Sequence, residues 1–144
     1  MPATSVIVEA LGGPATLEQR VESPADLSAH IRAGLPYASL ESVMANFDLR
    51  REEVTSALHL PARTLARRKQ DQRLSPDESD RLVRFVWLAA QAVQVLGSKE
   101  KASLWLRREN RALGGHPPIE LLDTDVGARQ VEAVLGRIEH GVYS

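Results

Sequence analysis

The sequence predicts an all-α protein. From about residue 24 onward, apolar residues recur at spacings of three and four, which is the period of helices that bury one face. Aromatic residues make up only 4% of the chain, and β-branched residues do not alternate with polar ones as they do in strands. With 144 residues, 43% of them hydrophobic, the chain can form a real core in one compact domain or two small ones.

The N-terminal part contains one clear helix. Ser23 and Pro24 fit the N-cap and first helical position of a helix that Gly34 closes. Residues 1–22 are less regular, since they are interrupted by Gly12, Gly13 and Pro14. They fit a loose arm or a short helix, so residues 1–35 are expected to form an arm or helix whose role stays open.

The middle part, residues 36–97, is expected to hold several helices. The first presents one apolar face, made by Leu40, Val43, Met44 and Phe47. Asp48 is expected to cap a second, short helix, and Pro61 to open a third over residues 61–70. Ser75 and Glu78 have the spacing of a capping box, which begins a long apolar helix that Gly97 ends.

The C-terminal part, residues 98–144, has a different pattern, with shorter elements. It predicts a helix over residues 99–109, a break at "ALGGHPP", a turn at 118–122 and a last helix from Thr124 to about His140. Gly141 is the expected residue just beyond that helix. We therefore place a domain boundary near residues 97–98.

Charge is concentrated in the middle of the chain. The net charge of the whole sequence is −1, yet residues 49–73 carry seven basic and three acidic side chains. The segment "HLPARTLARRKQDQRLS" alone contains five basic residues. A local positive potential of this kind attracts polyanions, although the overall pI of about 6.4 limits such a surface to one face.

Two short helices joined by a tight turn, with the second one basic, are typical of a helix-turn-helix. On a helical wheel with Leu65 facing inward, Arg63, Arg67 and Gln70 fall at about 160°, 200° and 140°, on the outward face. Arginine and glutamine can make paired hydrogen bonds to base edges in the major groove. The plainer alternative is an ordinary charged surface helix.

Arg68 and Lys69 fall nearer the buried side of the same wheel. They are expected to contact phosphates or to pair with Asp77, Glu78 or Asp80 at the start of the next helix. The complete set of predicted DNA-binding residues is Arg63, Thr64, Arg67, Arg68, Lys69, Gln70 and Arg73.

Catalytic and metal sites are not indicated. The four histidines lack the spacing of a metal-binding helix, and no cysteine is present. Asp123 and Asp125 are explained by capping, and Gly114-Gly115 by helix termination. The sequence shows neither an apolar run long enough to span a membrane nor a signal peptide. We expect a cytoplasmic protein that is not an enzyme and uses no cofactor and no metal.

Two segments resemble a known family, the antitoxins of RES–Xre toxin–antitoxin systems, which include ParS-like and MbcA-like antitoxins. They are "RTLARRKQDQRLSPDESDRLVRF" (63–85) and "ASLWLRRENRALGGHPPIELLDTDVGARQVEAVLGRIEHGVYS" (102–144). The resemblance covers roughly residues 36–144. It implies an Xre-like helix-turn-helix domain that binds the promoter of its own operon, followed by a small helical toxin-binding domain.

The resemblance also implies a partner, a RES-domain toxin that degrades NAD⁺. In such systems the C-terminal end of the antitoxin enters the active-site cleft of the toxin and blocks NAD⁺. The corresponding toxin-binding residues here are Arg137, Glu139, His140, Gly141, Val142, Tyr143 and Ser144. An α-carboxylate at Ser144 suits basic residues that hold phosphates, and Tyr143 offers a ring for stacking.

Two points stay open at this stage. Without the resemblance, residues 141–144 are better explained as a frayed end without a role. The leading alternative function is a stand-alone helix-turn-helix regulator whose C-terminal domain binds a ligand or partner. In either case a homodimer is expected, because such repressors usually read two half-sites with two-fold symmetry.

Overall fold

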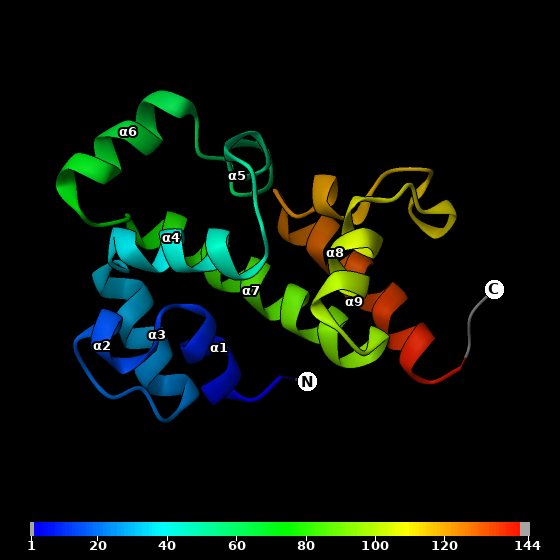
Figure 1. Ribbon diagram of the computed structural model, residues 1–144, viewed down its shortest axis with the longest axis horizontal. Coiled ribbons are helices and arrows are strands. Elements are labelled where there is room, and N and C mark those ends of the chain that lie inside the picture. Colours follow the sequence, from blue (N-terminus) through cyan, green and yellow to red (C-terminus); the bar gives the residue numbers. More distant parts are fainter. Residues whose placement is uncertain (1, 142–144) are drawn as a thin grey trace.

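The computed structural model describes residues 2–141 and confirms the all-α class (Figure 1). Among these residues there is no strand, and one isolated antiparallel bridge joins Pro36 to Arg73. The helices are α1 (Thr4–Ala10), α2 (Gly13–Leu17), α3 (Pro24–Ala33), α4 (Tyr37–Asn46), α5 (Arg51–Ala57), α6 (Ala62–Asp71), α7 (Pro76–Leu96), α8 (Lys99–Arg107) and α9 (Asp125–Glu139). Two 3₁₀ turns, η1 (Arg111–Leu113) and η2 (Pro118–Leu121), lie between α8 and α9.

Helix α7 is the central element of the fold. Helices α1, α3, α8 and α9 pack against it, and its own buried residues include Leu82, Phe85 and Val86. The predicted capping box is present at its start: the Glu78 amide donates to Ser75 Oγ at 3.2 Å, and the Ser75 amide donates to Glu78 Oε1 at 2.8 Å. Gly97 ends the helix with φ 101°, as expected.

Residues 2–22 are folded onto this core. They form the two short helices α1 and α2, so of the two alternatives for this segment the loose arm is wrong. Five apolar side chains of the segment are buried: Ile7, Val8, Leu11, Leu17 and Val21. Helix α1 contacts both α4 and α7, and Ser42 Oγ donates to the Ala10 carbonyl at 3.0 Å. The N-terminal helices therefore cover the core that supports the basic helix.

The helix predicted to start at Asp48 starts two residues later. Arg50 occupies the N-cap position of α5, and its amide donates to Glu53 Oε1 at 2.9 Å. Asp48 instead adopts a left-handed conformation with φ 51°. The following Leu49 is buried in the core, and the Glu53 side chain, not Asp48, caps the start of α5.

A close backbone approach fastens the linker before α4 to the linker before α7. Gly34 has φ 88°, and a Cβ atom there would lie 2.3 Å from the Leu74 carbonyl oxygen. The Leu74 amide donates to the Leu35 carbonyl at 2.8 Å, and the buried Leu35 amide donates to Ser79 Oγ at 2.8 Å. Gly34 thus closes α3, as expected, and also leaves room for the chain that leads out of α6.

Within residues 2–141, none of the helices has both the length and the apolar character that crossing a bilayer requires.

Candidate functional site

The basic helix α6 stands at one end of the long axis of the molecule (Figure 1). Leu65 is buried and anchors it, whereas Arg63, Arg67 and Gln70 are exposed, as the wheel predicts. In the turn before α6, Leu58 and Leu60 are buried. The structure therefore brings the three predicted base-reading side chains to one accessible face.

Arg68 is held by the start of α7. Its Nε donates to Glu78 Oε1 at 2.7 Å, and the side chains of Arg68 and Glu78 are 23% and 6% exposed. Burial by itself raises the pKa of Glu78, but the hydrogen bonds from Arg68 and from the Ser75 amide outweigh it and hold that pKa below its usual range. Of the two roles expected for Arg68, the structure shows the pairing with Glu78.

The other predicted DNA-binding residues lie around the end of α6. Lys69 is exposed, so its expected place near the buried side is wrong, because the buried side of α6 runs through Leu65 and the half-buried Arg68 and leaves Lys69 outside it. Thr64 is half-buried. Arg73 lies beyond the helix, and its Nη1 donates to the Gly34 carbonyl at 2.6 Å.

Helix α9 ends at the opposite end of the molecule (Figure 1). Val131, Val134 and Leu135 attach it to the core, while Arg137, Glu139, His140 and Gly141 are exposed. His140 Nε2 lies 3.7 Å from Glu139 Oε1, and Gly141 follows with φ 70°, as expected for the residue after a helix. The predicted contacts at Val142, Tyr143 and Ser144 lie outside the described residues.

The segment "NRALGGH" forms a closed loop between α8 and α9. The buried Asn110 accepts, at its side-chain oxygen, the Ala112 amide at 3.0 Å, and its carbonyl accepts the Gly115 amide at 2.9 Å. Gly114 and Gly115 have φ of 70° and 86°, which explains the glycine pair. The loop places η2 against α5 and α9.

The segment "LLDTDVGA" fixes the start of α9. Thr124 is the N-cap, and its Oγ accepts the Gly127 amide at 3.0 Å. A Cβ atom on Gly127 would lie 1.9 Å from the Leu121 carbonyl oxygen, so no larger residue fits between α9 and η2. The motif therefore sets the direction in which α9 leaves the core.

Comparison with known families assigns both parts of the chain. Residues 26–86 match the family described as the antitoxin Xre-like helix-turn-helix domain. Residues 91–141 match the antitoxin Xre/MbcA/ParS C-terminal toxin-binding domain. The two matches meet inside the single helix α7.

Individual relatives extend over most of the chain. An Antitoxin Xre from Yersinia enterocolitica is 36% identical over 116 residues, which cover 79% of this chain and 78% of the relative. The chain belongs to the Xre/MbcA/ParS antitoxin family. An Antitoxin Xre from Photorhabdus laumondii is 33% identical over 120 residues, covering 82% and 81% of the two chains. A Prs ADP-ribosylating antitoxin from Sphingobium sp. is 29% identical over 132 residues, covering 85% and 83%.

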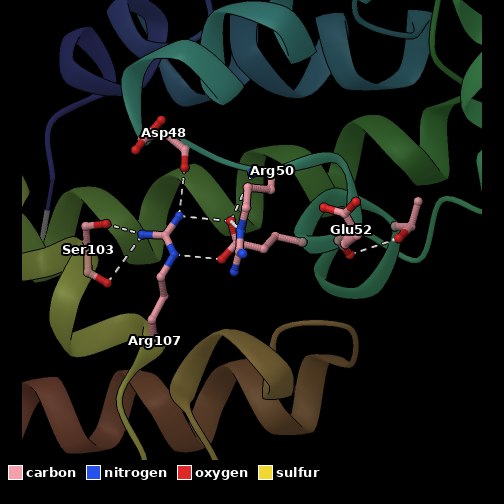
Figure 2. Close-up of polar contacts among 7 residues, drawn as sticks. Asp48, Arg50, Glu52, Ser103 and Arg107 are labelled. Carbon is pink, nitrogen blue, oxygen red and sulfur yellow. Dashed lines mark hydrogen bonds and ion pairs between the residues drawn. The ribbon is translucent and has the colours of Figure 1, made fainter.

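Sequence reasoning missed one residue of this antitoxin that the structure makes prominent, Arg107 (Figure 2). Its Nε and Nη2 donate to the two carboxylate oxygens of Glu53 at 2.7 and 3.0 Å. Nη2 also donates to the Asp48 carbonyl at 2.8 Å, and Nη1 to the carbonyl and hydroxyl of Ser103. Glu53 and Arg107 are 54 residues apart, so no local spacing reveals the pair.

Proposed function

We propose that this antitoxin neutralises a cognate RES-domain toxin that degrades NAD⁺, by placing its C-terminal end in the toxin's active-site cleft. One observation carries the proposal: the toxin-binding family matches residues 91–141 and so extends to the exposed end of α9. Arg137, Glu139, His140 and Gly141 are accessible there, and Val142, Tyr143 and Ser144 follow in sequence.

The name of one relative supports the chemistry proposed for the toxin. The Sphingobium relative is a Prs ADP-ribosylating antitoxin, a name that joins an antitoxin to ADP-ribosylation. ADP-ribosylation consumes NAD⁺, and a RES-domain toxin that degrades NAD⁺ would bind the same molecule. The aromatic ring of Tyr143, which follows α9 in the sequence, suits a cleft that holds flat rings.

The second activity in the proposal is repression of its own operon by a cytoplasmic homodimer. Arg63, Arg67 and Gln70 share the exposed face of α6, where they can reach base edges in the major groove. Thr64, Lys69 and Arg73 border that face and can contact phosphates. Two copies would be needed to read two half-sites. Helix α6 and the described end of α9 lie at opposite ends of the molecule, so the proposal allows both partners to be held at once (Figure 1).

Co-purification tests this proposal. The product of the neighbouring gene, which the proposal expects to be a RES-domain protein, is co-expressed with the full chain, and NAD⁺ hydrolysis is measured with and without the antitoxin. We expect a stable complex in which hydrolysis is suppressed. A chain that binds its upstream DNA but neither captures nor inhibits the RES-domain protein would instead be a stand-alone regulator.

A further inference from the structure

The ion pair between Arg107 and Glu53 joins the two parts of the antitoxin. Arg107 lies in the last turn of α8, inside the segment that matches the toxin-binding family, and Glu53 lies in the first turn of α5, inside the helix-turn-helix segment. Two parallel hydrogen bonds between a guanidinium and a carboxylate are among the strongest polar contacts in proteins, and they fix orientation as well as distance.

This pair is largely withdrawn from water. The side chains of Arg107 and Glu53 are 27% and 11% exposed. Burial by itself raises the pKa of Glu53, but the hydrogen bonds from Arg107 and from the Arg50 amide outweigh it and hold that pKa below its usual range. Glu53 is therefore ionised at neutral pH, and without Arg107 a poorly solvated carboxylate would have to move toward water. Such a movement would displace the start of α5.

Arg107 also fixes the chain just before α5. Its Nη2 donates to the carbonyl of Asp48, the residue held in a left-handed conformation. Ser103, one turn earlier in α8, accepts from Nη1 and so orients the guanidinium (Figure 2). The 3₁₀ turn η2 packs against α5 as well. The toxin-binding part thus holds both the entry to α5 and its first turn.

A short turn connects α5 to α6 and is held in place by hydrogen bonds and by burial. The Leu60 amide donates to the Thr55 carbonyl at 3.2 Å, and Arg81 of α7 donates through Nε to the Leu58 carbonyl at 2.9 Å. Leu58 and Leu60 are both buried, so the turn is fastened to the core. Helices α5 and α6 are therefore linked by a short buried turn, and the placement of α5 bears on that of α6 through it.

We propose that Arg107 is a positioning residue for DNA binding that is supplied by the toxin-binding part. It holds α5 and α6 in the arrangement that binds the operator, and toxin bound at the proposed site at the end of α9 changes operator affinity through it. This inference rests on the function proposed above. Because such coupling is reciprocal, operator DNA changes the affinity for the toxin by the same factor.

The test compares full-length wild type with Arg107→Met and with Arg108→Met. Arg108 is the exposed neighbour, so its substitution removes the same charge without touching Glu53. Affinity for DNA from upstream of the gene is measured by fluorescence anisotropy, with and without the toxin identified by the co-purification described above. We expect Arg107→Met to lower operator affinity about fivefold or more, and we expect that affinity no longer to change when toxin is added. The variant should still capture the toxin. Arg108→Met should keep the response.

Other results would overturn the inference. One is an operator affinity of the wild type that does not change when toxin is added. The other is an Arg107→Met variant that matches Arg108→Met both in operator affinity and in the change of that affinity with toxin. If circular dichroism shows that Arg107→Met is unfolded, Arg107→Lys replaces it, because lysine keeps the charge but not the paired geometry. An Arg107→Lys variant with wild-type operator affinity, and with the wild-type change of that affinity on adding toxin, would then contradict the inference. Failure of the proposed function itself is distinct, since the wild type would then fail to capture the toxin or fail to bind the upstream DNA. A wild type that binds both, but whose operator affinity does not change with toxin, overturns this inference alone.

Discussion

Nε of Arg68 lies 2.7 Å from Oε1 of Glu78, so the basic helix α6 is joined to the start of α7 by one of its own arginines. Its neighbour Arg67 is exposed and points to the face predicted to read DNA. Adjacent arginines in one basic run therefore have different tasks, one inside the fold and one on the proposed operator surface.

Substituting these two arginines should separate folding from DNA binding. Arg67→Ala should cost about 1 to 3 kcal/mol in operator binding and relax base preference, while changing the free energy of unfolding by no more than about 0.5 kcal/mol. Arg68→Ala should lower the free energy of unfolding by about 2 kcal/mol, since it leaves Glu78 buried without its partner. Urea denaturation and operator titration of both variants measure the two effects. Equal operator affinity for wild type and Arg67→Ala would contradict the assignment.

The same pair predicts a dependence of stability on pH. Because the pKa of Glu78 is lowered in the folded state, its ionisation contributes stability above its ordinary pKa of 4.5, and that stability is lost as the pH falls through the folded-state value. Glu78→Gln should be less stable than wild type at pH 7 but should lose less stability between pH 5 and pH 3. Thermal melts across this range measure the difference. Parallel pH profiles for the two proteins would show that Glu78 does not contribute in this way.

Most of this fold could be predicted from the sequence, because its longer helices carry local signals. Ser23, Ser75 and Thr124 each cap the helix that their position indicates, and the wheel centred on Leu65 gives the exposed face of α6 correctly. Signals of this kind depend on neighbours within one or two turns, so they need no knowledge of the rest of the fold.

What could not be predicted depends on contacts between distant residues. Helices α1 and α2 span seven and five residues, too few to show a period, and only their burial against the core fixes them. The left-handed turn at Asp48 follows from the burial of Leu49 and from the hydrogen bond with Arg107, 59 residues away. The charge of Arg107 was visible in the sequence, but nothing local indicated Glu53 as its partner.

Two glycines of α9 should respond in opposite ways to the same substitution. Gly127→Ala would place a Cβ atom 1.9 Å from the Leu121 carbonyl oxygen, so α9 or η2 has to shift, and we expect a loss of about 1 to 3 kcal/mol in the free energy of unfolding. Gly136→Ala meets no atom within 4 Å and should gain about 0.5 to 1 kcal/mol from helix propensity. Urea denaturation compares them, and equal stabilities would refute the role given to Gly127.

The proposed site at the C-terminal end is tested by removing Val142, Tyr143 and Ser144. In the sequence the three residues follow α9, whose described end lies at the opposite end of the molecule from α6, so the truncated chain should keep its fold and its operator affinity. It should no longer protect NAD⁺ from the RES-domain protein, and cells that express the truncated pair should stop growing. Arg129→Ala, an exposed change at the other end of α9, serves as control and should protect fully. If cells tolerate the truncated pair as well as the full-length pair, the antitoxin does not block the cleft with its C-terminal end.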